Sequence, residues 1–270
     1  MFSSSITRAT MAALGLVMAL VSPSQAQRVI PDHEWCDGDR GNSRAERYCE
    51  VREYDLDARD LVRVNAEPNG GIQVEAWDRN EIRLLAKVQA WSRRGDPQEI
   101  VDQVEIETEN TVSADGPRLR DREGWAASYR LMVPRNSNLD LETMNGGIRI
   151  QGVRGQMDFS TMNGGIALDD VGGDVQGKTQ NGGVKVTLSG TQWEGEQLDL
   201  ETTNGSVTLT LPEDFRADLT TGTVNGSFNT DFPITVRGSL RSNRLSTELN
   251  GGGPPIRLVT TNGAVRIRSR

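Results

Sequence analysis

The sequence predicts an all-β protein, a single-domain parallel β-solenoid with about two short strands in each coil of 18–23 residues. The first observation is a repeat: between Leu139 and Leu211 the motif Thr-x-Asn-Gly recurs, with its asparagines at steps of 18, 18 and 23 residues. The second is strict alternation of apolar and polar residues around each motif, which is the period of a β-strand. Repeats of this length stack, because one unit cannot bury its apolar face alone.

The repeat places the same residue types at the same position of each coil. The asparagine column is Asn145, Asn163, Asn181, Asn204, Asn225 and Asn262, with Asn69 as a distant relative, and the threonine column is Thr143, Thr161, Thr179, Thr202, Thr223 and Thr260. Equivalent residues of a solenoid lie about 4.8 Å apart and can form ladders, whereas in a meander of Asn-Gly hairpins they lie about 10 Å apart. The constant offsets favour the solenoid, with Asn and Gly at left-handed corner positions.

The chain begins with the features of a secretory signal peptide at residues 1–26. Arg8 precedes an apolar run from Met11 to Val21, which is shorter than a membrane span, and Ser24-Gln25-Ala26 offers a cleavage site. An uncleaved N-terminal anchor is the alternative. We therefore expect an exported protein, in the periplasm or else at the cell surface or secreted, with no stable membrane span in the mature chain.

Residues 27–60 are expected to form a polar leader with little regular structure, stapled by a disulfide between Cys36 and Cys49. Export makes a disulfide the default for two cysteines. A zinc site that adds His33 is the alternative, although this spacing matches no usual zinc finger.

Residues 61–134 are expected to form an irregular N-terminal β cap, and residues 135–270 the solenoid repeats. Within the cap a short helix is expected near 96–103, where Asp96 is an N-cap and Pro97 the first helical residue. The last coil carries Arg266, Arg268 and Arg270, whose charges would protect an exposed sheet edge.

The repeats resemble those of the exported "putative adhesin" proteins of bacteria, a domain-of-unknown-function family whose repeats read T-x-N-G-x-I-x-V-x-G. The resemblance covers about residues 60–270 and rests on the six Thr-x-Asn-Gly copies, on Val133-Pro134 before the first coil, and on Gly251-Gly252-Gly253-Pro254 before the last. Trp35-Cys36 and Tyr48-Cys49 are also similar to envelope members from Gram-negative bacteria. The resemblance implies a right-handed β-solenoid at the cell envelope and no enzymatic activity.

We expect no catalytic residue, cofactor or metal. The mature chain has one histidine, His33, and no Gly-x-Ser-x-Gly sequence, so a nucleophilic triad is not supported. Paired carboxylates at Asp169-Asp170 and Glu213-Asp214 keep open a carbohydrate-active β-helix enzyme, a polysaccharide lyase or hydrolase, and Asp169, Asp170 and Asp174 keep open a calcium site. Solvated corner acids are preferred, because neighbours in a strand point to opposite faces.

The asparagine and threonine columns are interpreted as structural ladders rather than as an array that binds cations, carbohydrate or ice. The candidate interaction residues are instead Trp125 and Trp193, expected to be exposed on loops, where an aromatic ring can stack on sugars or anchor a partner. A net charge of −8 without a basic patch argues against nucleic acid. The sequence thus predicts a non-enzymatic scaffold or adhesin-like interaction module for an unknown protein or glycan at the envelope; the alternatives are the enzyme and a structural or regulatory partner of an envelope complex.

Overall fold

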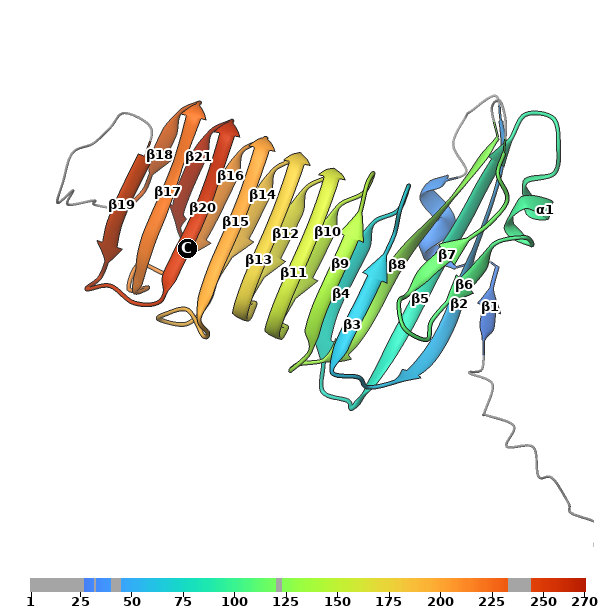
Figure 1. The fold of residues 1–270 in the computed structure, drawn as a ribbon, viewed down its shortest axis with the longest axis horizontal. Coiled ribbons are helices and arrows are strands. Elements are labelled where there is room, and N and C mark those ends of the chain that lie inside the picture. The colour runs from blue at the N-terminus through green and yellow to red at the C-terminus, as the bar shows by residue number, and fades with distance from the viewer. Residues whose placement is uncertain (1–26, 32, 40–44, 120–122, 233–243) are drawn as a thin grey trace, which may run out of the picture.

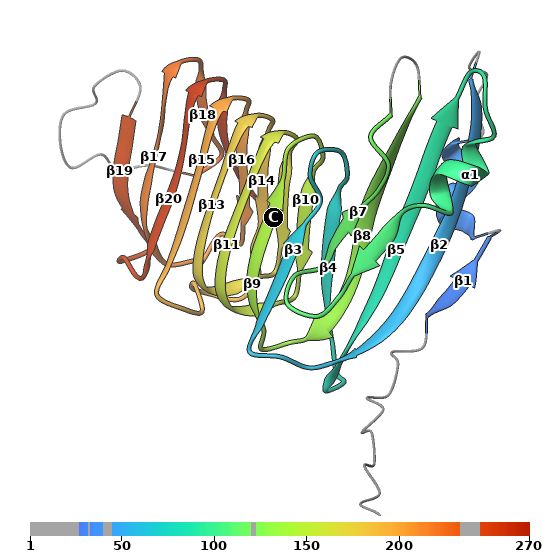
Figure 2. The same ribbon diagram turned by 45° about the vertical axis from the view of Figure 1, so that its right-hand side comes forward.

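The computed structural model describes residues 27–31, 33–39, 45–119, 123–232 and 244–270, so the expected signal peptide lies outside the described residues. An 11-stranded and an 8-stranded sheet line the two sides of an elongated stack of coils, with an antiparallel cap at the N-terminal end (Figures 1 and 2). This architecture confirms the predicted all-β parallel solenoid.

Each coil contributes one strand to each sheet. In spatial order the coils are β3 (Leu61–Asn65) with β4 (Ile72–Trp77), β9 (Asn138–Thr143) with β10 (Ile148–Gln151), β11 (Arg154–Asn163) with β12 (Ile166–Asp169), β13 (Gly172–Asn181) with β14 (Val184–Thr187), β15 (Gln197–Asn204) with β16 (Val207–Leu211), β20 (Pro255–Asn262) with β21 (Val265–Ser269), and β17 (Ala217–Asn225) with β18 (Phe228–Thr230). The strands pair in parallel and in register, so that Asn163 lies beside Asn181 and Asn181 beside Asn204. The two strands of a coil are unequal: β11 has 10 residues and β12 only 4.

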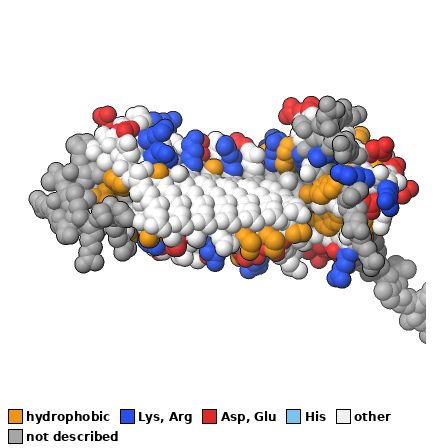
Figure 3. All heavy atoms as spheres, turned by 90° about the horizontal axis from the view of Figure 1, so that it is seen from above, with side chains coloured by type: hydrophobic (Ala, Val, Ile, Leu, Met, Phe, Trp, Pro, Cys, Tyr) orange, Lys and Arg blue, Asp and Glu red, His pale blue; other side chains and the backbone are white. Residues whose placement is uncertain are grey.

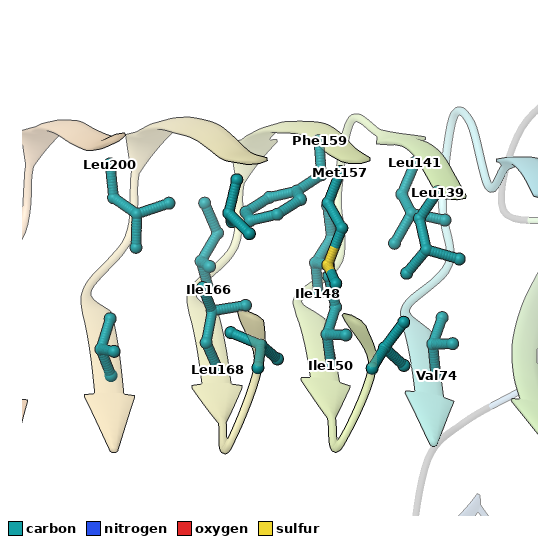
Figure 4. Close-up of a cluster of buried hydrophobic side chains, with 14 of the residues drawn as sticks. Val74, Leu139, Leu141, Ile148, Ile150, Met157, Phe159, Ile166, Leu168 and Leu200 are labelled. Atoms are coloured by element: carbon teal, nitrogen blue, oxygen red, sulfur yellow. The ribbon is translucent and has the colours of Figure 1, made fainter. Parts of the chain in front are cut away.

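The interior of the stack is filled by the alternating apolar residues. Figure 4 shows Leu139, Leu141, Met157 and Phe159 from one sheet facing Ile148, Ile150, Ile166 and Leu168 from the other, and each of these side chains is at most 1% exposed. The ring of Phe159 fills the space beside Gly177 of the next coil, where a Cβ would lie 2.0 Å from Cε2 of Phe159. Close packing of this kind explains the glycine among larger core residues.

The N-terminal cap consists of antiparallel strands that continue the 11-stranded sheet. They are β1 (Arg28–Ile30), β2 (Glu46–Asp57), β5 (Glu81–Ser92) and β8 (Gly124–Pro134); the cap also holds the 3-10 helix η1 (Glu34–Asp39), the helix α1 (Pro97–Val101) and the small sheet of β6 (Glu105–Glu107) and β7 (Ser113–Asp115). Helix α1 begins as expected, with Asp96 accepting a hydrogen bond of 2.8 Å from the backbone N–H of Gln98. Its apolar side, with Ile100 and Val101, packs on Val88 and Ala90 of β5.

The solenoid begins earlier in the chain than expected. Strands β3 and β4, placed in the cap by the sequence analysis, pair in parallel with β9 and β10 and form the first coil. Its Asn69-Gly70-Gly71 corner is therefore a true copy of the repeat, separated from the next copy by the inserted cap strands. The leader at 27–60 is also more regular than expected, because β2 pairs along its whole length with β5 and buries Val51, Tyr54 and Leu56.

The order of the coils at the C-terminal end differs from their order in the chain. Strand β20 lies between β15 and β17, and β21 lies between β16 and β18. The expectation that Arg266, Arg268 and Arg270 protect a sheet edge is therefore wrong for Arg266, which lies between Thr208 of β16 and Asn229 of β18. In the described part of the chain β18 pairs with Val265–Ile267, so Arg268 and Arg270 lie beyond the paired part of that edge. The end of the 8-stranded sheet is instead β19 (Arg244–Leu249), which runs antiparallel to β17. Sequence alone does not reveal this order, since both coils carry the same motif.

Candidate functional site

The asparagines form one continuous ladder along a corner of the solenoid. Each side-chain amide donates to the side-chain oxygen of the preceding coil over 2.8 to 3.1 Å, in the order Asn69, Asn145, Asn163, Asn181, Asn204, Asn262, Asn225. All but Asn69 are exposed. From Asn163 onward each amide uses one N–H in the ladder and has a second that can face solvent or a ligand, whereas Asn145 also donates to the backbone oxygen of Pro68 over 2.9 Å.

The threonines lie beneath this ladder and not on the surface. Thr143, Thr161, Thr179, Thr202, Thr223 and Thr260 are all buried. The Thr161 hydroxyl donates to the backbone oxygen of Gly146 over 2.8 Å, and the Thr179 hydroxyl donates to that of Gly164 over 2.8 Å. A buried hydroxyl that bonds the corner of the previous coil is structural, so the threonine column is no exposed array for sugar or ice.

The first glycine after each asparagine is required by close coil packing and not by a left-handed backbone. None of these glycines, and none of the ladder asparagines, has a positive φ angle. A Cβ on Gly164 would instead lie 1.9 Å from the backbone oxygen of Gly146, and one on Gly182 would lie 1.9 Å from that of Gly164. The expected left-handed corner is therefore wrong here; it is found at the opposite corner, where Gly152 has a φ of 71° and Gly173 one of 116°.

The result is a flat corner face that carries no charged side chain over the described coils. Seen from above, Figure 3 shows a broad pale strip of backbone and uncharged polar side chains, with Lys and Arg gathered along one border and hydrophobic side chains along the other. Residues that precede the ladder asparagines line one border, among them the exposed Met162 and Val224. Such a face offers regularly spaced amide donors and acceptors on a rigid support.

Neither tryptophan expected on the surface is exposed. Trp193 is 2% exposed, and its indole N–H donates to the backbone oxygen of Gly173 over 3.1 Å. Trp125 is half-buried against the core, and its indole N–H donates to the backbone oxygen of Pro117 over 3.0 Å. The loop that holds Trp193 folds back and buries the ring, whereas Trp125 lies in strand β8 and packs partly against the core; each indole N–H finds an internal acceptor, as is usual for a buried tryptophan.

A different tryptophan, Trp35 of η1, lies beside the corner face. It borders a groove of about 350 Å³ together with Gly71, Gly147, Gly165 and Arg149. The Cys36–Cys49 disulfide fixes the next residue of η1, and Lys87 donates to the backbone oxygen of Trp35 over 3.1 Å. The sequence analysis quoted Trp35-Cys36 only as part of the resemblance; the adjacency of an aromatic residue to the disulfide is the signal that could have singled it out.

Two of the acidic residues considered for catalysis or calcium, Asp170 and Asp174, are engaged in corner contacts. Asp170 accepts from the Ser189 hydroxyl over 2.5 Å and pairs with Arg154 over 3.3 Å, while Asp174 accepts from the side chain of Gln197 over 3.0 Å. Within the described ranges, no three or more His, Cys, Asp or Glu side chains gather to hold a metal. The cysteines are joined to each other, so they are no zinc ligands, and His33 Nδ1 accepts from the Trp35 backbone N–H over 3.0 Å.

A second, larger groove of about 780 Å³ opens at the opposite corner near the cap, lined by polar residues that include Arg59, Asn80, Asn138 and Arg154. Both of its arginines already have partners within the protein: Arg59 donates to the backbone oxygen of Thr108 over 3.0 Å, and Arg154 pairs with Glu194 over 2.9 Å.

Among the described residues, no helix is long and apolar enough to cross a membrane.

Comparison with known proteins assigns the family. The family model described as Toastrack DUF4097 matches residues 62–268. No curated protein matches significantly. Similar solved structures include a "putative cell adhesion protein" from Clostridium sporogenes ATCC 15579 (9% identity, 84% of this chain and 100% of that one, TM-score 0.39) and a "putative adhesin" from Bacteroides fragilis NCTC 9343 (12%, 82% and 97%, TM-score 0.40). A third is a "putative lipid binding protein" from Parabacteroides distasonis ATCC 8503 (9%, 82% and 96%, TM-score 0.35). These structural likenesses are weak, whereas the family model spans the coils and the cap strands β5 and β8 that are inserted between the first two coils, and the chain belongs to the Toastrack DUF4097 family, a family of unknown function.

Proposed function

We propose that the chain is a non-enzymatic, exported β-solenoid that acts as an adhesin-like interaction module or scaffold at the bacterial cell envelope, in the periplasm. The observation that carries this proposal is the flat corner face, which runs without a charged side chain along the stacked coils. The coils hold its amide groups in fixed positions through the Asn ladder, so little conformational entropy is lost when a partner binds. An extended, preorganised polar face suits a long partner better than a small substrate.

Export is supported by the Cys36–Cys49 disulfide, because such bonds persist in oxidising compartments. We propose that residues 1–26 are the signal peptide that delivers the chain there, and that the exported part combines the disulfide-stapled cap with the solenoid. Cell fractionation of a Gram-negative host that expresses the full chain tests this directly. The expected product appears in the periplasmic fraction with its N-terminus at Gln27; a product that stays in the cytoplasm with reduced cysteines contradicts export.

The interaction role is tested with the purified protein and isolated envelope fractions in a co-sedimentation assay. We expect saturable binding that is weakened by Gln180→Glu, which puts a charge beside Asn181 on the corner face. The matched control is Gln176→Glu, the same change at another exposed position of the same strand, on the outer sheet face. Absence of binding to every fraction contradicts the proposal, and cleavage of envelope polysaccharide during the assay would favour the enzyme instead.

A further inference from the structure

The groove beside Trp35 contains glycines that the fold does not require. The second glycine of the corner is Gly71, Gly147 and Gly165 in the three coils that line the groove. A Cβ at these positions would lie 3.4, 3.1 and 3.2 Å from the nearest backbone oxygen, against 1.9 Å for the first glycine of the same corners at 146 and 164. The equivalent positions in the later coils are Gly183, which lies outside the groove, and then Ser206, Ala264 and Ser227. Packing therefore tolerates a small side chain there, and its absence keeps the floor of this groove open.

The groove has an aromatic wall that is held in place. The guanidinium carbon of Arg130 lies 4.0 Å from the centroid of the Trp35 ring, and the Lys87 ammonium lies 5.7 Å from it. The disulfide at Cys36 and the hydrogen bond from Lys87 to the backbone oxygen of Trp35 fix the main chain of η1. A partly exposed indole in a fixed orientation is a stacking surface for the apolar face of a sugar ring.

Among the described residues that line the groove, Arg149 is the only charged one, and it is basic in an otherwise acidic protein. Arg149 lines the groove from the outer face of β10, is exposed, and forms no ion pair with any described residue. Arg130 likewise pairs with no carboxylate in the described part of the chain, and its Nε is buried without a hydrogen-bond partner. The nearest acids along the neighbouring strands, Glu75 and Asp169, lie further from the corner and do not neutralise Arg149. Uncompensated guanidinium groups beside a ligand-sized groove favour an anionic occupant.

We propose that this groove binds an acidic saccharide, with a sugar ring stacked on Trp35, its carboxylate or phosphate on Arg149, and its hydroxyls over the open glycine floor. The side-chain amide of Gln73 and the hydroxyl of Ser128 also line the groove and supply polar contacts of the kind that sugar hydroxyls need. The groove is shallow and open, which does not suit a buried acyl chain. This inference rests on the proposed interaction function and names the ligand class and the place where it binds.

The test is a binding screen of the full chain, purified after expression under oxidising conditions. The probes are immobilised oligosaccharides bearing uronate, sialate or phosphate groups, each beside a neutral oligosaccharide of the same backbone, together with anionic phospholipid vesicles. We expect binding to at least one acidic oligosaccharide, weaker at high salt, and no binding to its neutral counterpart. Failure of every acidic probe, equal binding of the neutral counterparts, or equal binding of the vesicles overturns the inference.

Two matched pairs of variants place the binding in the groove. Arg149→Gln should weaken binding about tenfold or more, whereas Lys185→Gln should leave it unchanged, because Lys185 occupies the equivalent exposed position two coils away, outside the groove. Gly165→Ser should likewise weaken binding by filling the floor, whereas Gly183→Ser should not, although its Cβ has a similar clearance of 3.3 Å. Equal losses within either pair overturn the assignment.

The two proposals fail in different ways. If the protein sediments with envelope fractions but binds no acidic oligosaccharide, the corner face is still an interaction surface and only the groove inference is wrong. If it binds neither, the proposed function is wrong as well. The groove variants alter solenoid residues and leave η1 intact, and equal thermal unfolding midpoints for each pair exclude misfolding as the cause of lost binding.

Discussion

The corner glycines provide the sharpest test of the fold, through the adjacent pair Gly182 and Gly183. A Cβ on Gly182 would lie 1.9 Å from the backbone oxygen of Gly164, whereas one on Gly183 would lie 3.3 Å from that of Ser206. Gly182→Ala must therefore push two coils apart by more than 1 Å, roughly the difference between this contact and an ordinary one, and overpacking of this kind costs about 1–3 kcal/mol or somewhat more.

The same displacement disturbs a hydrogen bond. The backbone oxygen of Gly164 that a new methyl group would strike also accepts from the buried Thr179 hydroxyl over 2.8 Å. Loss of that bond adds about 1 kcal/mol. The total, about 2–4 kcal/mol, corresponds to a fall of roughly 10 °C in melting temperature for a domain of this size. Gly183→Ala should change stability by less than about 1 kcal/mol, because a contact of 3.3 Å needs only a small shift of the neighbouring coil and the change also lowers the conformational entropy of the unfolded chain.

Thermal and urea unfolding of the two alanine variants, followed by circular dichroism with the disulfide intact, measures the difference. A large loss for Gly182→Ala and a small change for Gly183→Ala is the expected result. Similar midpoints for the two variants would refute the argument, since they would show that the coils yield freely or that the glycine is conserved in the motif for a reason other than coil spacing.

Three further changes have effects that follow from the described contacts. Asn163→Ala removes two exposed ladder bonds, of 2.8 Å to Asn145 and 2.9 Å from Asn181, and should destabilise by about 1–2 kcal/mol in urea unfolding; no change would show that water replaces the ladder. Joint replacement of Cys36 and Cys49 by serine should cost about 3 kcal/mol, as expected for a loop of this length, and reductant should reproduce the loss in the parent protein only. Burial, and to a smaller extent the nearby Tyr54, raises the pKa of Tyr129. The contribution of Tyr129 to stability is therefore complete below about pH 10, where the phenol is neutral in the unfolded chain too. It is lost as the pH rises above that value, because the unfolded phenol ionises while the buried one stays neutral. Tyr129→Phe should therefore flatten the alkaline fall in stability and be at least as stable at pH 7, because the hydroxyl has no hydrogen-bond partner among the described residues; a steeper alkaline fall would contradict this.

The period-two alternation and the constant offsets predicted the solenoid because both are local, repeated features. Residues such as Leu139 and Ile148 mark the buried side of every coil, and identical spacing of Asn145, Asn163 and Asn181 is what stacking demands. The first coil was assigned to the cap because its corner at Asn69 is separated from the next by the inserted strands β5 and β8, and no local signal crosses an insertion of that length.

The site residues were harder to predict, because exposure depends on how a loop packs. Trp193 was expected on the surface from its polar, glycine-rich neighbours, yet the loop closes over the end of the coil and buries the ring. Trp35 was not chosen, because its approach to Gly71 and Gly147 depends on where a disulfide places η1 on a sheet formed by distant strands. The corner glycines were predicted at the correct positions but attributed to a left-handed backbone. Only the stacked structure shows that the backbone oxygen of the neighbouring coil, and not the φ angle, excludes a side chain there.

The position of β20 between β15 and β17 has a consequence for how the chain reaches its final form. During synthesis β17 is complete before β20 exists, and both strands carry the Thr-x-Asn-Gly register that matches β15. A chain that folds as it emerges can therefore stack β17 directly on β15 and leave the terminal coil outside, a topological isomer that keeps most of the ladder. The native arrangement thus requires that residues 255–269 stack on β15 before β17 does. A chain that ends before these residues leaves the edges of β15 and β17 free to pair with each other or with another molecule.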